Sequence, residues 1–122
     1  MVRKVVSFVI IYPFTIDDNG ILTHTRGDTA QFELRVEVYG QPLTSYNATF
    51  SVKQFPDDDS YLYQVQFNQS TPCYITHNLT AGLPYGSYWW DVQIVYYDPL
   101  EKNTQTKTVG AFPYILRPDV TS

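Results

Sequence analysis

The sequence predicts an all-β protein, specifically an immunoglobulin-like antiparallel β-sandwich of about seven to nine strands. Its composition favours strands, with 11 Tyr, 7 Phe and 2 Trp but only 16% charged residues. Short segments alternate apolar and polar residues, and turn signals separate them at intervals of about eight to twelve residues. No segment of useful length has a helical period. A chain of 122 residues is long enough for one domain with a core of its own.

The first expected strand runs from Arg3 to Tyr12 and is closed by Pro13. Its apolar run is short and β-branched, and no small-residue cleavage site follows it, so we interpret it as a strand and not as a signal peptide. It is also too short to cross a bilayer. The residues Asp17-Asp18-Asn19-Gly20 are typical of a turn. A hairpin-like return through Ile21 to Thr25 is expected after that turn.

The next segments form the first half of the predicted sandwich. Arg26-Gly27-Asp28 spells a tripeptide that integrins recognise, but a tight turn needs a glycine at this place, and we interpret it as a corner. Phe32 to Val38 alternates cleanly between apolar and charged residues, which predicts a core strand with one buried and one solvent-exposed face. Gly40-Gln41-Pro42 turns the chain, and Ala48 to Lys53 is the following strand.

An acidic loop, Pro56 to Ser60, separates this strand from two shorter ones. These are expected at Leu62 to Phe67 and at Cys73 to His77, with a break at Asn68 to Pro72. Asn78 to Gly82 has room for one helical turn or a wide loop.

The turn Leu83-Pro84-Tyr85-Gly86 leads into the most regular aromatic strand of the chain. Alternation places Trp89, Asp91 and Gln93 on a half-exposed face. The opposite face is expected to lie in the core, and it carries Tyr88, Trp90, Val92 and Ile94.

The last predicted hairpin turns at Asp98 to Asn103, and its second strand runs from about Thr104 to Leu116. Pro113 within that strand indicates an edge position or a bulge, because proline cannot donate to the ladder. We therefore divide the chain into an N-terminal strand and hairpin extension, residues 1–24, and a β-sandwich domain, residues 25–122.

The chain offers no recognisable catalytic chemistry. Only two histidines occur, His24 and His77, and neither has a Cys or acidic residue at ligand spacing, which argues against a metal site. The single Cys73 excludes an intrachain disulfide and is expected to be a buried, inert thiol. No Gly-x-Ser-x-Gly elbow presents a nucleophile, and Asp57 to Asp59 reads as a solvated loop that lacks the spacing of a calcium site. We expect no enzyme activity, no catalytic residue, no cofactor and no bound metal.

The net charge of -4 and the scattered positions of the eight basic residues argue against nucleic-acid binding, which needs clustered Lys and Arg. No membrane partner is expected either.

Several short motifs occur in an order that resembles a known family. The motifs are Arg26-Gly27-Asp28-Thr29 leading into Phe32 to Val36, the strand Ala48 to Lys53, the segment Leu83 to Ile94, and the closing run Leu116-Arg117-Pro118-Asp119-Val120-Thr121. Together they resemble the small β-sandwich domains of tailed-phage virion proteins, of the kind found at the N-terminus of baseplate upper proteins and in related tail, neck and capsid-associated proteins. The resemblance covers roughly Thr25 to Ser122, and residues 1–24 are an addition to it.

This resemblance implies a structural component of a tailed-phage virion, assembled in the host cytoplasm and placed in the tail, baseplate or neck or on the capsid. Its partners would be other virion proteins, with repeated copies or a homo-oligomer on a symmetric assembly. The candidate interface consists of apolar residues in the first strand and of aromatic residues on the outer face of the Tyr88 strand. The first strand either joins its own sheet, which we favour, or augments a neighbour's edge. The candidate interface residues are Val5, Phe8, Ile10, Tyr12, Trp89 and Tyr97.

Two alternatives stay open. A carbohydrate-binding module would use Trp89, Tyr97 and part of the Tyr61/Tyr63 pair as a sugar-stacking platform. A cell-surface adhesion domain of immunoglobulin type would be glycosylated at one or more of its three sequons, Asn47, Asn68 and Asn78.

Overall fold

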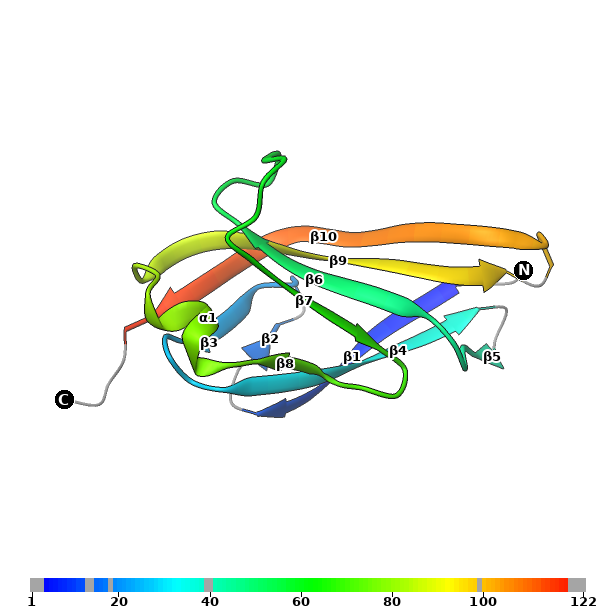
Figure 1. The fold of residues 1–122 in the computed structure, drawn as a ribbon, viewed down its shortest axis with the longest axis horizontal. Coiled ribbons are helices and arrows are strands. Elements are labelled where there is room, and N and C mark those ends of the chain that lie inside the picture. The colour runs from blue at the N-terminus through cyan, green and yellow to red at the C-terminus, as the bar shows by residue number, and fades with distance from the viewer. Residues whose placement is uncertain (1–3, 13–14, 18, 39–40, 99, 119–122) are drawn as a thin grey trace.

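A computed structural model describes the chain over residues 4–12, 15–17, 19–38, 41–98 and 100–118, and it describes side-chain surroundings for these residues except 4–12, 15, 34, 35, 37 and 38. The elements in this part of the chain are nearly all strands (Figure 1). They are β1 (Lys4–Tyr12), β2 (Thr15–Ile16), β3 (Leu22–Thr25), β4 (Ala30–Val38), β5 (Gln41–Pro42), β6 (Asn47–Lys53), β7 (Tyr63–Asn68), β8 (Cys73–Ile75), α1 (His77–Ala81), β9 (Gly86–Asp98) and β10 (Asn103–Arg117).

The strands form two sheets, which confirms the all-β prediction. In the four-stranded sheet, β4 is central: β1 runs along one edge, and β8 and β5 pair with the two ends of the other edge. The six-stranded sheet has the order β2-β3-β10-β9-β6-β7 (Figure 1). All neighbours in both sheets are antiparallel except β3 and β10, which run parallel from Leu22↔Tyr114 to Thr25↔Arg117.

The N-terminal strand joins a sheet of its own chain. β1 pairs with β4 along its length, from Lys4↔Val38 to Tyr12↔Gln31. The prediction that this strand augments its own sheet is therefore supported by the backbone. The side chains of the predicted interface residues Val5, Phe8, Ile10 and Tyr12 lie outside the described part of the structure.

Alternation in β9 separates the core from an outer face, as the sequence predicts. The inward-facing residues of this strand are at most 5% exposed, and they come at every second position. They are Tyr88, Trp90, Val92, Ile94, Tyr96 and, at the end of the strand, Asp98.

Aromatic contacts join the two sheets across the core. Phe32 of β4 lies 5.4 Å, centroid to centroid, from Phe50 of β6 and 5.5 Å from Phe67 of β7. Phe50 in turn lies 6.0 Å from Trp90 of β9. These edge-on and tilted geometries are those that the ring quadrupoles favour. Because Phe32 and Phe50 are fully buried, this contact fixes how the sheets face each other.

The turn between β2 and β3 is held by both side-chain and steric contacts. The Asp17 carboxylate accepts hydrogen bonds from the backbone N–H groups of Asn19 and Ile21, each at 2.9 Å. Gly20 has φ +82°, and a Cβ atom there would lie 2.7 Å from the Phe112 ring, so only glycine fits. The Trp90 indole N–H donates to the Gly20 carbonyl at 2.9 Å. The predicted turn is thereby confirmed and is tied to the core.

One predicted boundary is wrong. The expected strand from Cys73 to His77 ends at Ile75, and His77 is the first residue of α1. The chain leaves the sheet because the α1 residues contact the distant Arg26-Gly27-Asp28 corner, a tertiary interaction that sequence periodicity does not reveal. The helical turn expected near Asn78 to Gly82 is present as α1. Among the described residues, no helix is long and apolar enough to be a membrane span.

We expect the Phe50→Ala substitution to lower the free energy of unfolding by about 3–5 kcal/mol, because it removes a buried ring that contacts both sheets. Phe55→Ala is the matched control. Phe55 is 60% exposed, so the same chemical change there should alter stability by no more than about 0.5 kcal/mol. Urea unfolding followed by tryptophan fluorescence measures both variants. Equal losses in the two variants would contradict the assigned core.

Candidate functional site

The outer face of the six-stranded sheet is the first candidate site, and the alternation of β9 defines it. Trp89, Asp91, Gln93, Val95 and Tyr97 point away from the core side. The register aligns these positions with outward-facing residues of neighbouring strands. These are Asn47, Thr49, Ser51 and Lys53 of β6, Gln64, Gln66 and Asn68 of β7, and Thr104, Thr106 and Thr108 of β10.

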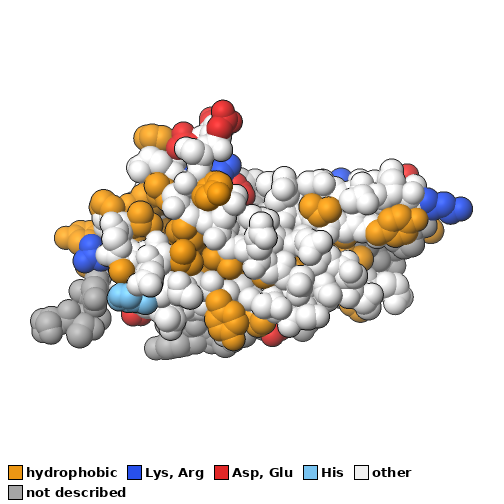
Figure 2. Space-filling model, viewed as in Figure 1, with side chains coloured by type: hydrophobic (Ala, Val, Ile, Leu, Met, Phe, Trp, Pro, Cys, Tyr) orange, Lys and Arg blue, Asp and Glu red, His pale blue; other side chains and the backbone are white. Residues whose placement is uncertain are grey.

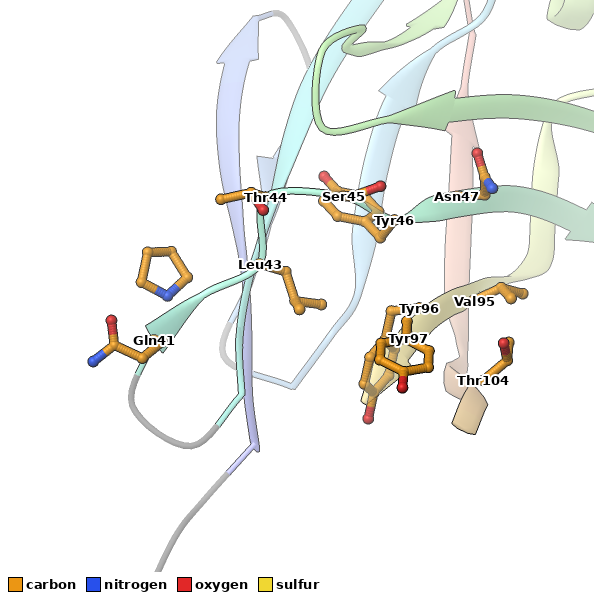
Figure 3. A pocket seen from close by; sticks show the side chains of 11 residues that line it. Gln41, Leu43, Thr44, Ser45, Tyr46, Asn47, Val95, Tyr96, Tyr97 and Thr104 are labelled. Carbon is orange, nitrogen blue, oxygen red and sulfur yellow. The ribbon is translucent and has the colours of Figure 1, made fainter. Parts of the chain in front are cut away.

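A hollow, here called the end hollow, lies where β9 approaches β5 and the connection from β5 to β6 (Figure 3). Its volume is about 510 Å³. In Figure 3 the side chain of Leu43 points toward Tyr96 and Tyr97, which lie together at the end of β9. The described lining residues are uncharged: Gln41, Pro42, Leu43, Thr44, Ser45, Tyr46, Asn47, Val95, Tyr96, Tyr97 and Thr104.

A second hollow, the loop hollow, lies on the same sheet beside the projecting loop between β6 and β7. Its volume is about 260 Å³. Lys53 and Asp91 form an ion pair there, with Nζ 3.4 Å from Oδ2, and the Gln64 side-chain amide donates to Ser51 Oγ at 3.0 Å. Tyr61, 53% exposed, also lines the hollow. The loop hollow is therefore polar, with one exposed aromatic side chain.

The two hollows are adjacent on the sheet. Asn47 and Val95, which pair across β6 and β9, line the end hollow, and the next outward-facing pair, Thr49 and Gln93, lines the loop hollow. Successive outward positions on a strand are about 6.8 Å apart. The hollows thus adjoin each other at these pairs, and we call the two hollows together with the outward-facing residues of β6, β7, β9 and β10 the polar face.

A different cluster, the motif corner, lies at the end of the molecule that carries α1. The Gly27 backbone N–H donates to Thr80 Oγ1 at 2.8 Å, and the His77 Nδ1–H donates to the Gly27 carbonyl at 2.7 Å. The Arg26 N–H donates to the Arg117 carbonyl at 3.0 Å, and the Arg26 guanidinium carbon lies 5.2 Å from the centroid of the Tyr85 ring. Gly27 has φ +82°, which confirms that Arg26-Gly27-Asp28 forms a turn.

The turn before β9 closes on itself at this corner. The Tyr88 hydroxyl, at the start of β9, donates to the Pro84 carbonyl four residues upstream. The first, third and last motifs of the family resemblance therefore meet at the motif corner. Because their polar groups are used within the chain, the described contacts there serve the fold.

A buried chain of hydrogen bonds lies beside the motif corner. Tyr63 donates its hydroxyl proton to Tyr114 at 2.9 Å, and the Tyr114 hydroxyl lies 2.6 Å from His24 Nδ1. His24 Nε2 lies 2.9 Å from the Asp28 carbonyl oxygen. Since that carbonyl only accepts, Nε2 carries the proton, and Nδ1 accepts from Tyr114. His24 is therefore held as the neutral imidazole.

Burial lowers the pKa of His24 from its ordinary value, and the opposing effects of the Asp28 carbonyl and carboxylate are smaller. Burial raises the pKa of Tyr63 and of Tyr114. Cys73 is a fully buried free thiol, as expected, and burial raises its pKa. A buried thiol of raised pKa carries little thiolate and is a poor nucleophile.

Among the described residues, no group of three His, Cys, Asp or Glu side chains is placed to hold a metal ion. The acidic loop places its side chains at the tip of a projection from the body (Figure 2). This part of the chain also carries Phe55, which is 60% exposed.

The aromatic residues predicted for the interface differ in how far they are exposed to solvent. Tyr97 is 58% exposed and lines the end hollow, whereas Trp89 is half-buried. Tyr61 is exposed, but Tyr63 is only 5% exposed and belongs to the buried hydrogen-bond chain. Sequence reasoning missed Leu43 and Gln64 in the hollows. Strand alternation in the sequence places Gln64 on the outer face, but it does not reveal the hydrogen bond between Gln64 and Ser51.

Comparisons of this chain with protein-family models, with curated proteins and with solved structures found no match.

We expect the stability contributed by neutral His24 to be lost on acidification. Its folded-state pKa is lowered, so the unfolded chain binds the proton first. The contribution is full above the unfolded pKa of about 6.5 and falls below that pH, by at most about 1.4 kcal/mol per pH unit. Urea unfolding at about pH 7.5 and pH 5.5 measures this loss as a fall in the unfolding midpoint.

His24→Gln should reduce the change in stability between these two pH values, whatever its effect on absolute stability. The matched control is His77→Gln, at the exposed end of the motif corner, which should retain the wild-type loss. If His24→Gln lost as much stability between about pH 7.5 and pH 5.5 as the wild type, the loss would not be caused by His24.

Proposed function

We propose that this chain is a non-enzymatic structural component of a tailed-phage virion and that it acts through protein–protein interfaces in the tail, baseplate, neck or capsid. The observation that carries the proposal is the motif corner. Motifs that are far apart in sequence but resemble those of virion β-sandwich domains contact one another through Arg26, which reaches the Tyr85 ring and the Arg117 carbonyl. A chance collection of short matches has no reason to converge in space.

We also propose that the fold is immunoglobulin-like. Three features support this: two facing sheets with a shared core, a long antiparallel β9–β10 hairpin, and a tyrosine at the start of β9 whose hydroxyl bonds back to Pro84. Such a tyrosine corner recurs in immunoglobulin-like sandwiches at the corresponding turn. The parallel pairing of β3 with β10 ties the N-terminal hairpin to the last strand.

Docking in a particle would use sheet edges and exposed aromatic residues. Within the described residues, β1 pairs only with β4, so one of its edges is free. The same residues show β10 paired only with β9 from Asn103 to Pro113, so its other edge is free over that range. Free strand edges present backbone donors and acceptors that a neighbouring chain can pair with. Trp89 and Tyr97 remain the aromatic candidates, at opposite ends of the outer face of β9.

Trp89, Tyr97 and Tyr63 do not form one aromatic platform for the carbohydrate-binding alternative. Trp89 and Tyr97 are eight positions apart on one strand, about 27 Å, and Tyr63 is buried. The adhesion alternative is tested by an intact mass of the native protein, which would exceed the mass of the unmodified chain if a sequon carried a glycan.

The virion proposal predicts that the chain is present in mature particles. Mass spectrometry of gradient-purified particles from the virus that encodes it should detect the chain at a fixed ratio to the major capsid protein. A low ratio that matches a tail or neck ring, or a high ratio that matches the capsid, gives its position. A chain that is expressed in infected cells but absent from purified particles would refute a structural role.

A further inference from the structure

We propose that the polar face is a binding site for an extended, uncharged oligosaccharide or polysaccharide chain. The site starts at the end hollow, where the end of β9 meets β5 of the four-stranded sheet, and continues along the outer face of the six-stranded sheet to the loop hollow. It adds a ligand to the proposed structural role and does not depend on the position of the protein in a particle.

The first argument is the shape of the face. Two hollows of about 510 and 260 Å³ are joined through the neighbouring pairs Asn47–Val95 and Thr49–Gln93. The result is an elongated surface that is concave at both ends. A linear polymer can occupy both hollows at once, whereas a single small molecule can occupy only one.

The second argument is charge. The residues that the structure describes around the end hollow are uncharged, and in the loop hollow the Lys53 ammonium lies 3.4 Å from the Asp91 carboxylate. Asp59 lines the loop hollow as an exposed residue. A face so poor in net charge offers no electrostatic attraction to an acidic polymer, so we infer an uncharged ligand.

The third argument is hydrogen-bonding chemistry. Amide side chains donate and accept at once, and threonine hydroxyls do the same. Sugar hydroxyls also donate and accept, so they match such a surface at many points. Along β6, β9 and β10 the outer face carries mainly amide and hydroxyl side chains. The exposed polar side chains are Asn47, Gln66, Gln93, Thr104, Thr106 and Thr108.

The fourth argument is the position of two exposed tyrosines. Tyr97 lies in the end hollow and is 58% exposed, and Tyr61 lies in the loop hollow and is 53% exposed. Aromatic rings offer a flat apolar surface with a polar tip, on which the C–H face of a sugar ring packs. One tyrosine at each end would hold the polymer across the face.

The test uses the purified full chain on a printed array of neutral and acidic oligosaccharides, from disaccharides to hexasaccharides. Affinity electrophoresis follows, in gels that contain the neutral polysaccharide whose fragments bind best. We expect binding to neutral glycans that strengthens with chain length and changes less than about twofold between roughly 50 and 500 mM NaCl, because salt screens only charged contacts.

Tyr61→Ala and Tyr97→Ala should each weaken binding about tenfold, and Gln93→Ala should weaken it severalfold. Tyr74→Ala is the matched control, since Tyr74 is also 53% exposed but lies on β8 in the other sheet. It should bind as the wild type does. Unchanged thermal unfolding midpoints for all four variants would show that the losses are not caused by unfolding.

The proposal is overturned if no neutral glycan binds, if only acidic glycans bind, or if Tyr74→Ala weakens binding as much as Tyr97→Ala. A protein occupant would be indicated if Thr106→Arg removed the chain from purified particles while the array stayed negative, and that result would also overturn the glycan site. The virion proposal is measured separately by the content of particles, so either one can fail while the other stands.

Discussion

The contact between Phe32 of β4 and Phe50 of β6 is the interaction on which the rest of the structure depends. Both side chains are fully buried, and their rings meet 5.4 Å apart from opposite sheets. Once this contact sets which face of β6 points inward, the register with β9 directs Asn47, Thr49 and Ser51 outward next to Val95, Gln93 and Asp91. The core contact therefore determines which side chains form the polar face.

Much of the fold was predictable because it depends on local alternation. The inward set from Tyr88 to Ile94, the turn at Asp17 to Gly20 and the corner at Gly27 follow from residue order and turn chemistry. The end of β8 was not predictable, because it depends on bonds from His77 and Thr80 to a corner about fifty residues earlier. Tertiary contacts of that kind leave no period in the sequence.

The candidate site was less predictable than the fold. The row Thr104, Thr106 and Thr108 is visible in the sequence, but its neighbours across β9 and β6 are set by pairing between distant segments. Sequence reasoning identified Tyr97 and considered Tyr61 as exposed aromatics, yet it grouped them with Tyr63, which the structure buries. Strand parity alone cannot distinguish a solvated face from a hollowed one, because the hollows depend on where the projecting loop and the β5–β6 connection lie.

Rigid side chains distinguish the polar face from an ordinary solvent-exposed sheet surface. Binding costs conformational entropy for each long side chain that must be ordered, and here part of that ordering already exists in the free protein. Gln64 is held on Ser51, Lys53 is held on Asp91, and the threonines of β10 are short and β-branched. The sheet below them is fixed by the core contacts of Phe50 and Trp90. A polymer that binds by many weak hydrogen bonds needs such preorganisation, since each bond contributes only about 0.5–1.5 kcal/mol net.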